Sequence, residues 1–146
     1  MISRKRNAAR RGNRRGGAIL EMSLTLALLL NLTFGMVEFG YYFYVKNSFA
    51  NAAREGARAG IVPGATNSSV TTAVTNALTA CHFPTSSYTT GITDSSGNND
   101  VSLDTEGTTV TVTVSATWGT IGAGYRPLNL ISSTKTVSAP VTMGHE

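Results

Sequence analysis

The sequence predicts an α+β fold: a long N-terminal membrane helix that continues into an outer domain with a second helix and a small antiparallel β-sheet. Three observations carry this prediction. An apolar run extends from Ala18 to Val37, small residues at helical spacing follow it as far as Gly60, and valine alternates with threonine around Val112. The chain has 146 residues, which leaves room beside the helix for one small core and little more.

The apolar run is long enough to span a bilayer. Its twenty residues contain one ionisable group, Glu21, and a helix of that length extends about 30 Å, the hydrocarbon thickness of a membrane. The net charge of +4 is uneven, because seven of the twelve basic residues lie in the first fifteen positions with no acid among them. A basic tail can bind nucleic acid, but one that precedes an apolar span follows more simply from the positive-inside rule. We therefore expect no nucleic-acid binding, a cytoplasmic N-terminus and an exported C-terminal part.

Changes in composition divide the chain into three parts. Residues 1–16 are polar and basic without apolar periodicity, and are expected to form a basic cytoplasmic leader. Residues 17–62 are expected to form the transmembrane and extended helix, which Pro63 and Gly64 end. Residues 63–146 are then an extracytoplasmic αβ domain.

The αβ domain is expected to begin with a second helix over residues 70–81, capped by Ser68 or Ser69. The apolar residues of this segment share one helical face; they are Val70, Ala73, Val74, Ala77, Leu78 and Cys81. As the only cysteine, Cys81 cannot form an internal disulfide. We expect it to be a small buried apolar residue, with a reactive role as the alternative.

Strands are expected after the second helix. The clearest spans residues 108–117, where valine and threonine alternate as in a half-buried antiparallel strand. Shorter strands are expected over residues 88–92 and 101–103. A last strand is expected over residues 134–141, with Pro140 near its end or on an edge of the sheet.

Gly16, Gly17 and Glu21 form the first motif that carries chemistry. Two glycines give a thin, extendable backbone of the kind that a protease can enter. An acid in an apolar helix is costly unless another group pairs with its charge. Taken alone, Glu21 is equally explained as an acid in the first turn of a helix, where the helix dipole favours it.

Two further features lie at the outer end of the helix. Glu38 begins an aromatic cluster that reaches Tyr44 and is expected to form a belt at the outer membrane interface. There Glu38 is expected to be solvated, with pairing to another subunit as the alternative. Beyond the belt, Ala52, Gly56 and Gly60 recur every four residues and give a face with almost no side chains, which lets another helix approach closely.

Together these features resemble the TadE-like family of tight-adherence (Tad, or Flp) pilus systems, over about residues 15–60. The resemblance rests on the glycine before an apolar helix, on Glu21, on the Glu38-Phe39-Gly40 step followed by aromatics, and on the Ala-Ala-Arg-Glu-Gly-Ala-Arg run from Ala52 to Arg58. It implies a pilin-like fold and a minor pilin or pseudopilin that takes part in pilus assembly and adhesion.

The resemblance also implies how the residues act. A prepilin peptidase would cut after Gly16, so that Gly17 becomes the first residue and Glu21 the fifth. Glu21 would pair with another subunit in the membrane, Glu38 would be the second candidate for such pairing, and Ala52, Gly56 and Gly60 would pack against other pilin helices. The implied partners are the membrane, the prepilin peptidase, other pilins or pseudopilins and Tad assembly proteins. The implied location is the bacterial inner (cytoplasmic) membrane, with the surface pilus as a second place. The alternative is an unprocessed bitopic, membrane-anchored binding protein with an exported domain.

The sequence offers no set of catalytic or metal-binding residues. His82 and His145 are the only histidines, so Ser-His-Asp, Cys-His and zinc-binding combinations are not available. Oxygen donors between Asp94 and Glu106 do not have the spacing of a calcium-binding EF-hand loop. We expect no enzyme activity, no cofactor and no metal.

Overall fold

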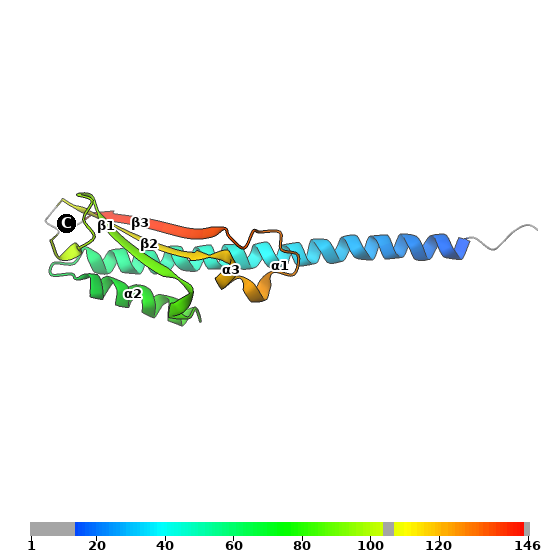
Figure 1. The fold of residues 1–146 in the computed structure, drawn as a ribbon, viewed down its shortest axis with the longest axis horizontal. Helices are drawn as coiled ribbons and strands as arrows, with labels where there is room; N and C mark the ends of the chain where they lie inside the picture. The colour runs from blue at the N-terminus through cyan, green and yellow to red at the C-terminus, as the bar shows by residue number, and fades with distance from the viewer. Residues whose placement is uncertain (1–13, 104–106, 145–146) are drawn as a thin grey trace, which may run out of the picture.

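The protein is built on one long helix, as the sequence predicts. The computed structural model describes residues 14–103 and 107–144. Figure 1 shows α1 (Arg14–Gly60) running the length of the molecule, with a shorter helix and a three-stranded sheet against its C-terminal half. The α+β layout is therefore confirmed. Most of the expected leader lies outside the described residues, and residues 14–16 belong to α1.

Helix α1 contains 47 residues, about 70 Å, without a break. Polar side chains in its apolar half bond to carbonyl groups one turn back, so each has a hydrogen-bond partner within the helix. Ser23 Oγ donates to Ile19 O at 2.8 Å, and Asn31 Nδ2 donates to Ala27 O at 2.9 Å. The helix ends at Gly60, just before Pro63 and the left-handed Gly64, as expected.

Helix α2 (Asn67–Ala80) begins three residues earlier than predicted. Thr66, and not Ser68 or Ser69, is the N-cap residue. Its side chain accepts a hydrogen bond from Ser69 N at 3.2 Å, and Ser69 Oγ accepts one from Thr66 N at 3.1 Å, which completes a capping box. The helix buries one face of its predicted apolar residues against α1; they are Val70, Val74 and Leu78.

The sheet consists of β1 (Thr89–Asp94), β2 (Thr109–Thr117) and β3 (Thr136–Gly144), in that order and antiparallel throughout. Val112 in the central strand pairs with Ile92 and with Val141. Pro140 lies on β3, an edge strand, which is a place where a sheet tolerates a residue without a backbone N–H.

Residues 101–103 were expected to form a strand, and this is wrong. They form a short 3₁₀ turn, η2 (Val101–Leu103). Asn67 Oδ1 accepts a hydrogen bond from Val101 N at 3.1 Å, so the start of α2 takes the backbone group that a neighbouring strand would need. Val101 is buried against the end of α1, near Gly60.

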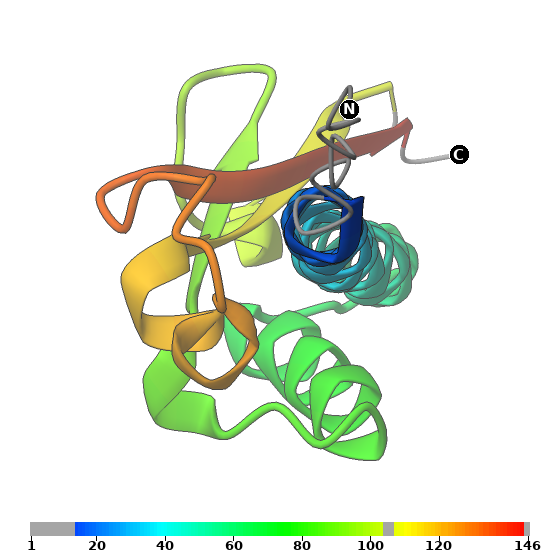
Figure 2. The ribbon, with the colours of Figure 1, turned by 90° about the vertical axis from the view of Figure 1, so that its right-hand side faces the viewer.

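The core lies between the inner face of the sheet, the C-terminal half of α1 and α2. Figure 2, which looks along α1, shows the sheet and α2 on two sides of that helix. Burial alternates along β2, where Val110, Val112 and Val114 are fully buried and the threonines between them face outward. Burying a valine stabilises a fold by roughly 1.5–3 kcal/mol. We call α2, the sheet and their connections the αβ unit.

Two short helical segments that the sequence did not indicate connect β2 to β3. They are α3 (Trp118–Ile121) and η3 (Ala123–Tyr125). The chain from Gly122 to Ile131, which we call the junction loop, runs back along α1 toward its apolar half (Figure 1).

Candidate functional site

The N-terminal half of α1 is not covered by other described parts of the chain, and we call residues 16–34 the bare segment. Every residue from 16 to 34 is exposed, and its leucines are among the most exposed apolar side chains, with Leu24 at 73% and Leu28 at 70%. Of the described residues, only α1 is both long and apolar enough to cross a membrane. An apolar surface of this extent calls for lipid or protein around it.

Gly16, Gly17 and Glu21 lie on the first two turns of this bare segment. A Cβ added at either glycine would meet nothing within 4 Å, so no other described element crowds these positions. The 16–17 peptide bond is nevertheless helical. A peptidase that cut this bond would first have to unwind the turn, which two glycines weaken by roughly 1 kcal/mol each relative to alanine. The side chain of Glu21 is exposed one turn from Gly17.

Glu38 was expected to be solvated at the membrane interface, and this is wrong. Its side chain is completely buried. Oε1 accepts a hydrogen bond from Ile131 N at 2.9 Å, across 93 residues of sequence. Oε2 is also buried and has no hydrogen-bond partner among the described residues. The junction loop covers Glu38 and excludes the water that would otherwise solvate it. Pairing of Glu38 with another subunit stays a prediction, and another subunit could reach the buried Oε2 only if the junction loop moved aside.

Only part of the aromatic cluster faces outward. Tyr41 stacks on Tyr125, with ring centroids 4.1 Å apart, and donates a hydrogen bond to Ile121 O at 3.3 Å. Tyr42 lies edge-on to the fully buried Trp118 at 5.3 Å. These two tyrosines are therefore half-buried, because the junction loop and α3 supply aromatic partners for them.

Two phenylalanines of the same cluster fit the belt expectation. Phe39 and Phe43 are 47% and 56% exposed. They extend the apolar surface of the bare segment by about two turns of helix.

The small-residue face of α1 meets other elements of the same chain. A Cβ on Gly56 would lie 2.6 Å from Val74 Cγ2 of α2 and 3.2 Å from Val112 Cγ1 of β2. A Cβ on Gly60 would lie 3.2 Å from both Val70 Cγ2 and Val110 Cγ1. Ala52 is buried in the same core. The αβ unit thus occupies this face, and no room is left there for a helix of another subunit.

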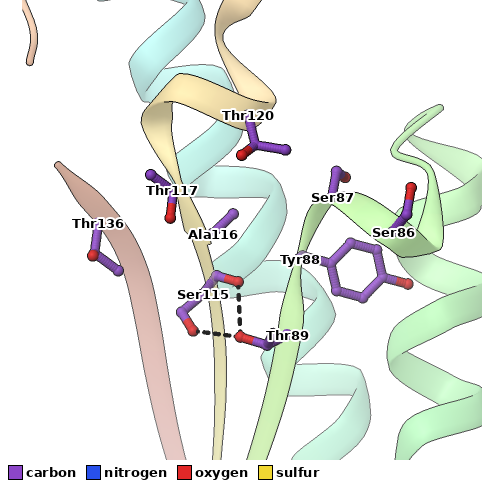
Figure 3. A pocket seen from close by; sticks show the side chains of 9 residues that line it. All are labelled: Ser86, Ser87, Tyr88, Thr89, Ser115, Ala116, Thr117, Thr120 and Thr136. Carbon is purple, nitrogen blue, oxygen red and sulfur yellow. Dashed lines mark hydrogen bonds between the residues drawn. The ribbon is translucent and has the colours of Figure 1, made fainter. Parts of the chain in front are cut away.

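A polar hollow of about 330 Å³ lies where β1 begins and β2 ends. Figure 3 shows that hydroxyl groups line most of it, with Thr89 Oγ1 and Ser115 Oγ 3.0 Å apart. No histidine, cysteine or acid lies among its lining residues. A set of hydroxyls without a base to activate them does not favour nucleophilic catalysis.

The other side chains of the αβ unit with reactive groups lie at the end of a helix or in turns. Cys81 is half-buried at the end of α2, less covered than predicted. His82 follows it in a left-handed turn with φ of 62°. Asp94 Oδ1 accepts hydrogen bonds from Ser96 N and Asn98 N, and thereby closes the turn after β1. No cluster of three or more His, Cys, Asp or Glu residues occurs within the described ranges.

A comparison with protein families matches residues 16–58 to the TadE-like protein family. No curated protein and no solved structure matches the chain. The matched segment covers the bare part of α1, Glu21, Glu38 and the first two residues of the small-residue face. It stops before Gly60 and leaves out the αβ unit. The family suggests a protein associated with Tad pili, and it is generally non-enzymatic. The resemblance seen in the sequence is thus confirmed for residues 16–58, which are similar to the TadE-like family.

Proposed function

We propose that this protein is a minor pilin or pseudopilin of a Tad-type pilus or secretion apparatus, with a role in assembly and adhesion and none in catalysis. The observation that carries the proposal is the combination of a bare apolar half-helix bearing Glu21 with an αβ unit fixed to the other half. A subunit that is held in a membrane and also packs into a helical bundle needs one half of its helix exposed and the other half attached to its folded domain.

The proposed topology follows from charge. The basic residues before Gly16 keep the N-terminus in the cytoplasm, since basic flanks stay on that side. The apolar half of α1 then spans the inner membrane once, and the αβ unit lies outside. A prepilin peptidase removes the leader by cutting after Gly16, and the new amine is that of Gly17.

Glu21 is the residue proposed to pair with the amine of Gly17 on a neighbouring subunit. A carboxylate in a low-dielectric environment gains much more from an opposite charge than one in water. Glu21 is exposed and free to receive that amine, whereas Glu38 already accepts a hydrogen bond inside its own chain.

The orientation of Glu21 supports this role. Glu21 and Phe39 are eighteen residues, or about five turns, apart and so lie on one side of α1. Phe39 is exposed, so the αβ unit leaves this side of the helix uncovered. A neighbouring helix that meets Glu21 can continue along α1 as far as Phe43 without displacing the αβ unit.

N-terminal sequencing of protein extracted from the native membrane tests the processing step. We expect Gly17 to be the first residue, and Gly16→Leu to leave the chain uncut. Gly40→Leu is the matched control, because a side chain at Gly40 also meets open space. A wild-type chain that retains Met1 or Ile2 would reject the processing and favour the unprocessed bitopic binding protein.

Surface-fibre counts test the pairing step. Glu21→Leu should remain in the membrane and give no fibres, while Glu55→Leu, at an exposed position on the αβ half of α1, should give normal fibres. Normal fibres with Glu21→Leu would reject the pairing.

A further inference from the structure

The bare segment of α1 is too short to hold the αβ unit clear of a bilayer. Residues 16–34 amount to nineteen residues, about 28 Å of helix. The hydrocarbon core alone is about 30 Å thick, and the bilayer with its headgroups is about 40–45 Å. The charged end of the helix, which is the basic leader before processing and the amine of Gly17 after it, opposes any shift of the helix outward, since its charge would enter the hydrocarbon. Tilting the helix shortens its projection further.

From this mismatch we infer that the junction loop lies in the outer headgroup layer, with its apolar side chains at the edge of the hydrocarbon, and forms a second lipid contact of the protein. The inference rests on the membrane span proposed above.

The junction loop is fixed at the required height. Leu130 Cδ1 would lie 3.6 Å from a Cβ on Gly35, which is where the bare segment ends. The bond from Ile131 N to Glu38 and the stack of Tyr125 on Tyr41 hold the loop to the next turns of α1. A shallow hollow between Phe34 and Val37 on one side and residues 123–127 on the other opens at the same level.

The composition of the loop suits lipid. Leu130 and Tyr125 are 55% and 51% exposed, although both are large and apolar or aromatic. Residues 107–144 contain two cations, Arg126 and Lys135, and no acid. Aromatic rings favour the membrane interface, and cations there are attracted to anionic headgroups.

The uncovered side of α1 agrees with this depth. Phe39, the residue after Glu38, is exposed. Its ring therefore lies at nearly the same position along the axis of α1 as the junction loop's contact with Glu38. The apolar surface thus surrounds the helix at this level. This continuity with the bare segment favours a bilayer over a second copy of the chain as the occupant.

Depth-dependent fluorescence quenching in proteoliposomes tests the inference. The full chain carries Cys81→Ser, and an environment-sensitive dye is attached to a single new cysteine at Leu130, Leu28 or Ser96. Vesicles of phosphatidylethanolamine and phosphatidylglycerol contain lipids with a spin-label quencher either near the headgroup or deep in the acyl chain. Gly124→Cys is a second loop site, where a side chain meets open space and disturbs no packing.

We expect the dye at Leu130 and at Gly124 to lose emission to the shallow quencher, and the dye at Leu28 to lose emission to the deep one. Ser96 lies in the turn between β1 and β2, at the end of the sheet near Gly60, and its dye should be affected by neither. If both loop sites behave like Ser96 while Leu28 is quenched, the membrane span stands and the loop inference is wrong. If Leu28 is not quenched, the span and the inference both fail. Energy transfer between loop dyes without quenching by lipid would assign the loop to a second copy and also overturn the inference.

Discussion

Alanine at Gly56 should destabilise the fold, although alanine normally stabilises a helix. The exchange of glycine for alanine in a helix gains about 1 kcal/mol in helix propensity. At Gly56, however, the new methyl would lie 2.6 Å from Val74 Cγ2 and 3.2 Å from Val112 Cγ1. Both valines are fully buried in a packed core, so neither can move away freely. Overpacking of this kind costs about 1–3 kcal/mol.

Gly40→Ala provides the reference, because a methyl there meets nothing within 4 Å on the same helix. The propensity gain is common to both variants and cancels in the comparison. We therefore expect Gly56→Ala to be less stable than Gly40→Ala by about 1–3 kcal/mol. The assay is equilibrium urea unfolding of the full chain in detergent micelles. It is followed by the fluorescence of Trp118, the only tryptophan, which is fully buried.

Truncation of the nearest obstacle makes the test sharper. Val74→Ala removes the methyl that lies 2.6 Å from the new group, so the double variant should be more stable than the sum of the two single effects predicts. Equal stability of Gly56→Ala and Gly40→Ala would refute the reasoning. It would mean that α2 does not press on this face and that the face is open to another subunit.

Three further variants probe other contacts. Glu38→Leu should lower the free energy of unfolding by about 1–3 kcal/mol, because Ile131 N loses its acceptor in a buried place, whereas Glu38→Gln should change it little; equal losses would show that the bond is unimportant. The hydroxyl and the backbone N–H of Ser102 both donate hydrogen bonds to the Asp100 carboxylate. These bonds hold the pKa of Asp100 below its ordinary value, and the bond from the hydroxyl has the larger effect. A depressed carboxyl pKa stabilises the fold above the unfolded-state pKa and loses this effect as pH falls through the folded-state pKa. Ser102→Ala should therefore raise the pKa of Asp100 in a carboxyl ¹³C NMR titration, and an unchanged titration would contradict the assignment. Phe39→Ser should reduce fibre assembly without changing urea stability, because its ring is exposed on the side of α1 that bears Glu21; a loss of stability would place the ring in the core instead.

The elements with strong periodicity were predictable from the sequence. The apolar run and the small residues after it predicted one continuous helix, and α1 is continuous from Arg14 to Gly60. Alternation of valine and threonine predicted β2 to within one residue. In both cases the side-chain period matches the backbone period over many residues, so no other conformation buries the same face.

The errors in the αβ unit have local causes. The start of α2 was missed because its capping box uses Ser69 at the third position, where glutamate is the more familiar partner. Val101 belongs to an apolar pair that fits a strand, but a side chain from α2 takes its backbone N–H. The approach of the junction loop to α1 depends on Tyr125 and Leu130 finding partners about ninety residues away. Periodicity within one segment contains no information about such contacts.

The burial of Glu38, in contrast, follows from a pattern present in the sequence. Ala52, Gly56 and Gly60 define one side of α1, and the same spacing of three or four residues continues backward through Phe49 and Val45. Another seven residues, about two turns, lead to Glu38 on that side. All of these residues are buried against the αβ unit. The aromatic residues after Glu38 suggested a membrane interface, but its position on the buried side of α1 places its carboxylate under the αβ unit. Glu21, by the same count, is about 100° around the helix from Glu38. Glu21 and Glu38 thus make different contacts, because the helix turns their side chains onto different sides: Glu38 accepts a hydrogen bond within the chain, and Glu21 faces outward.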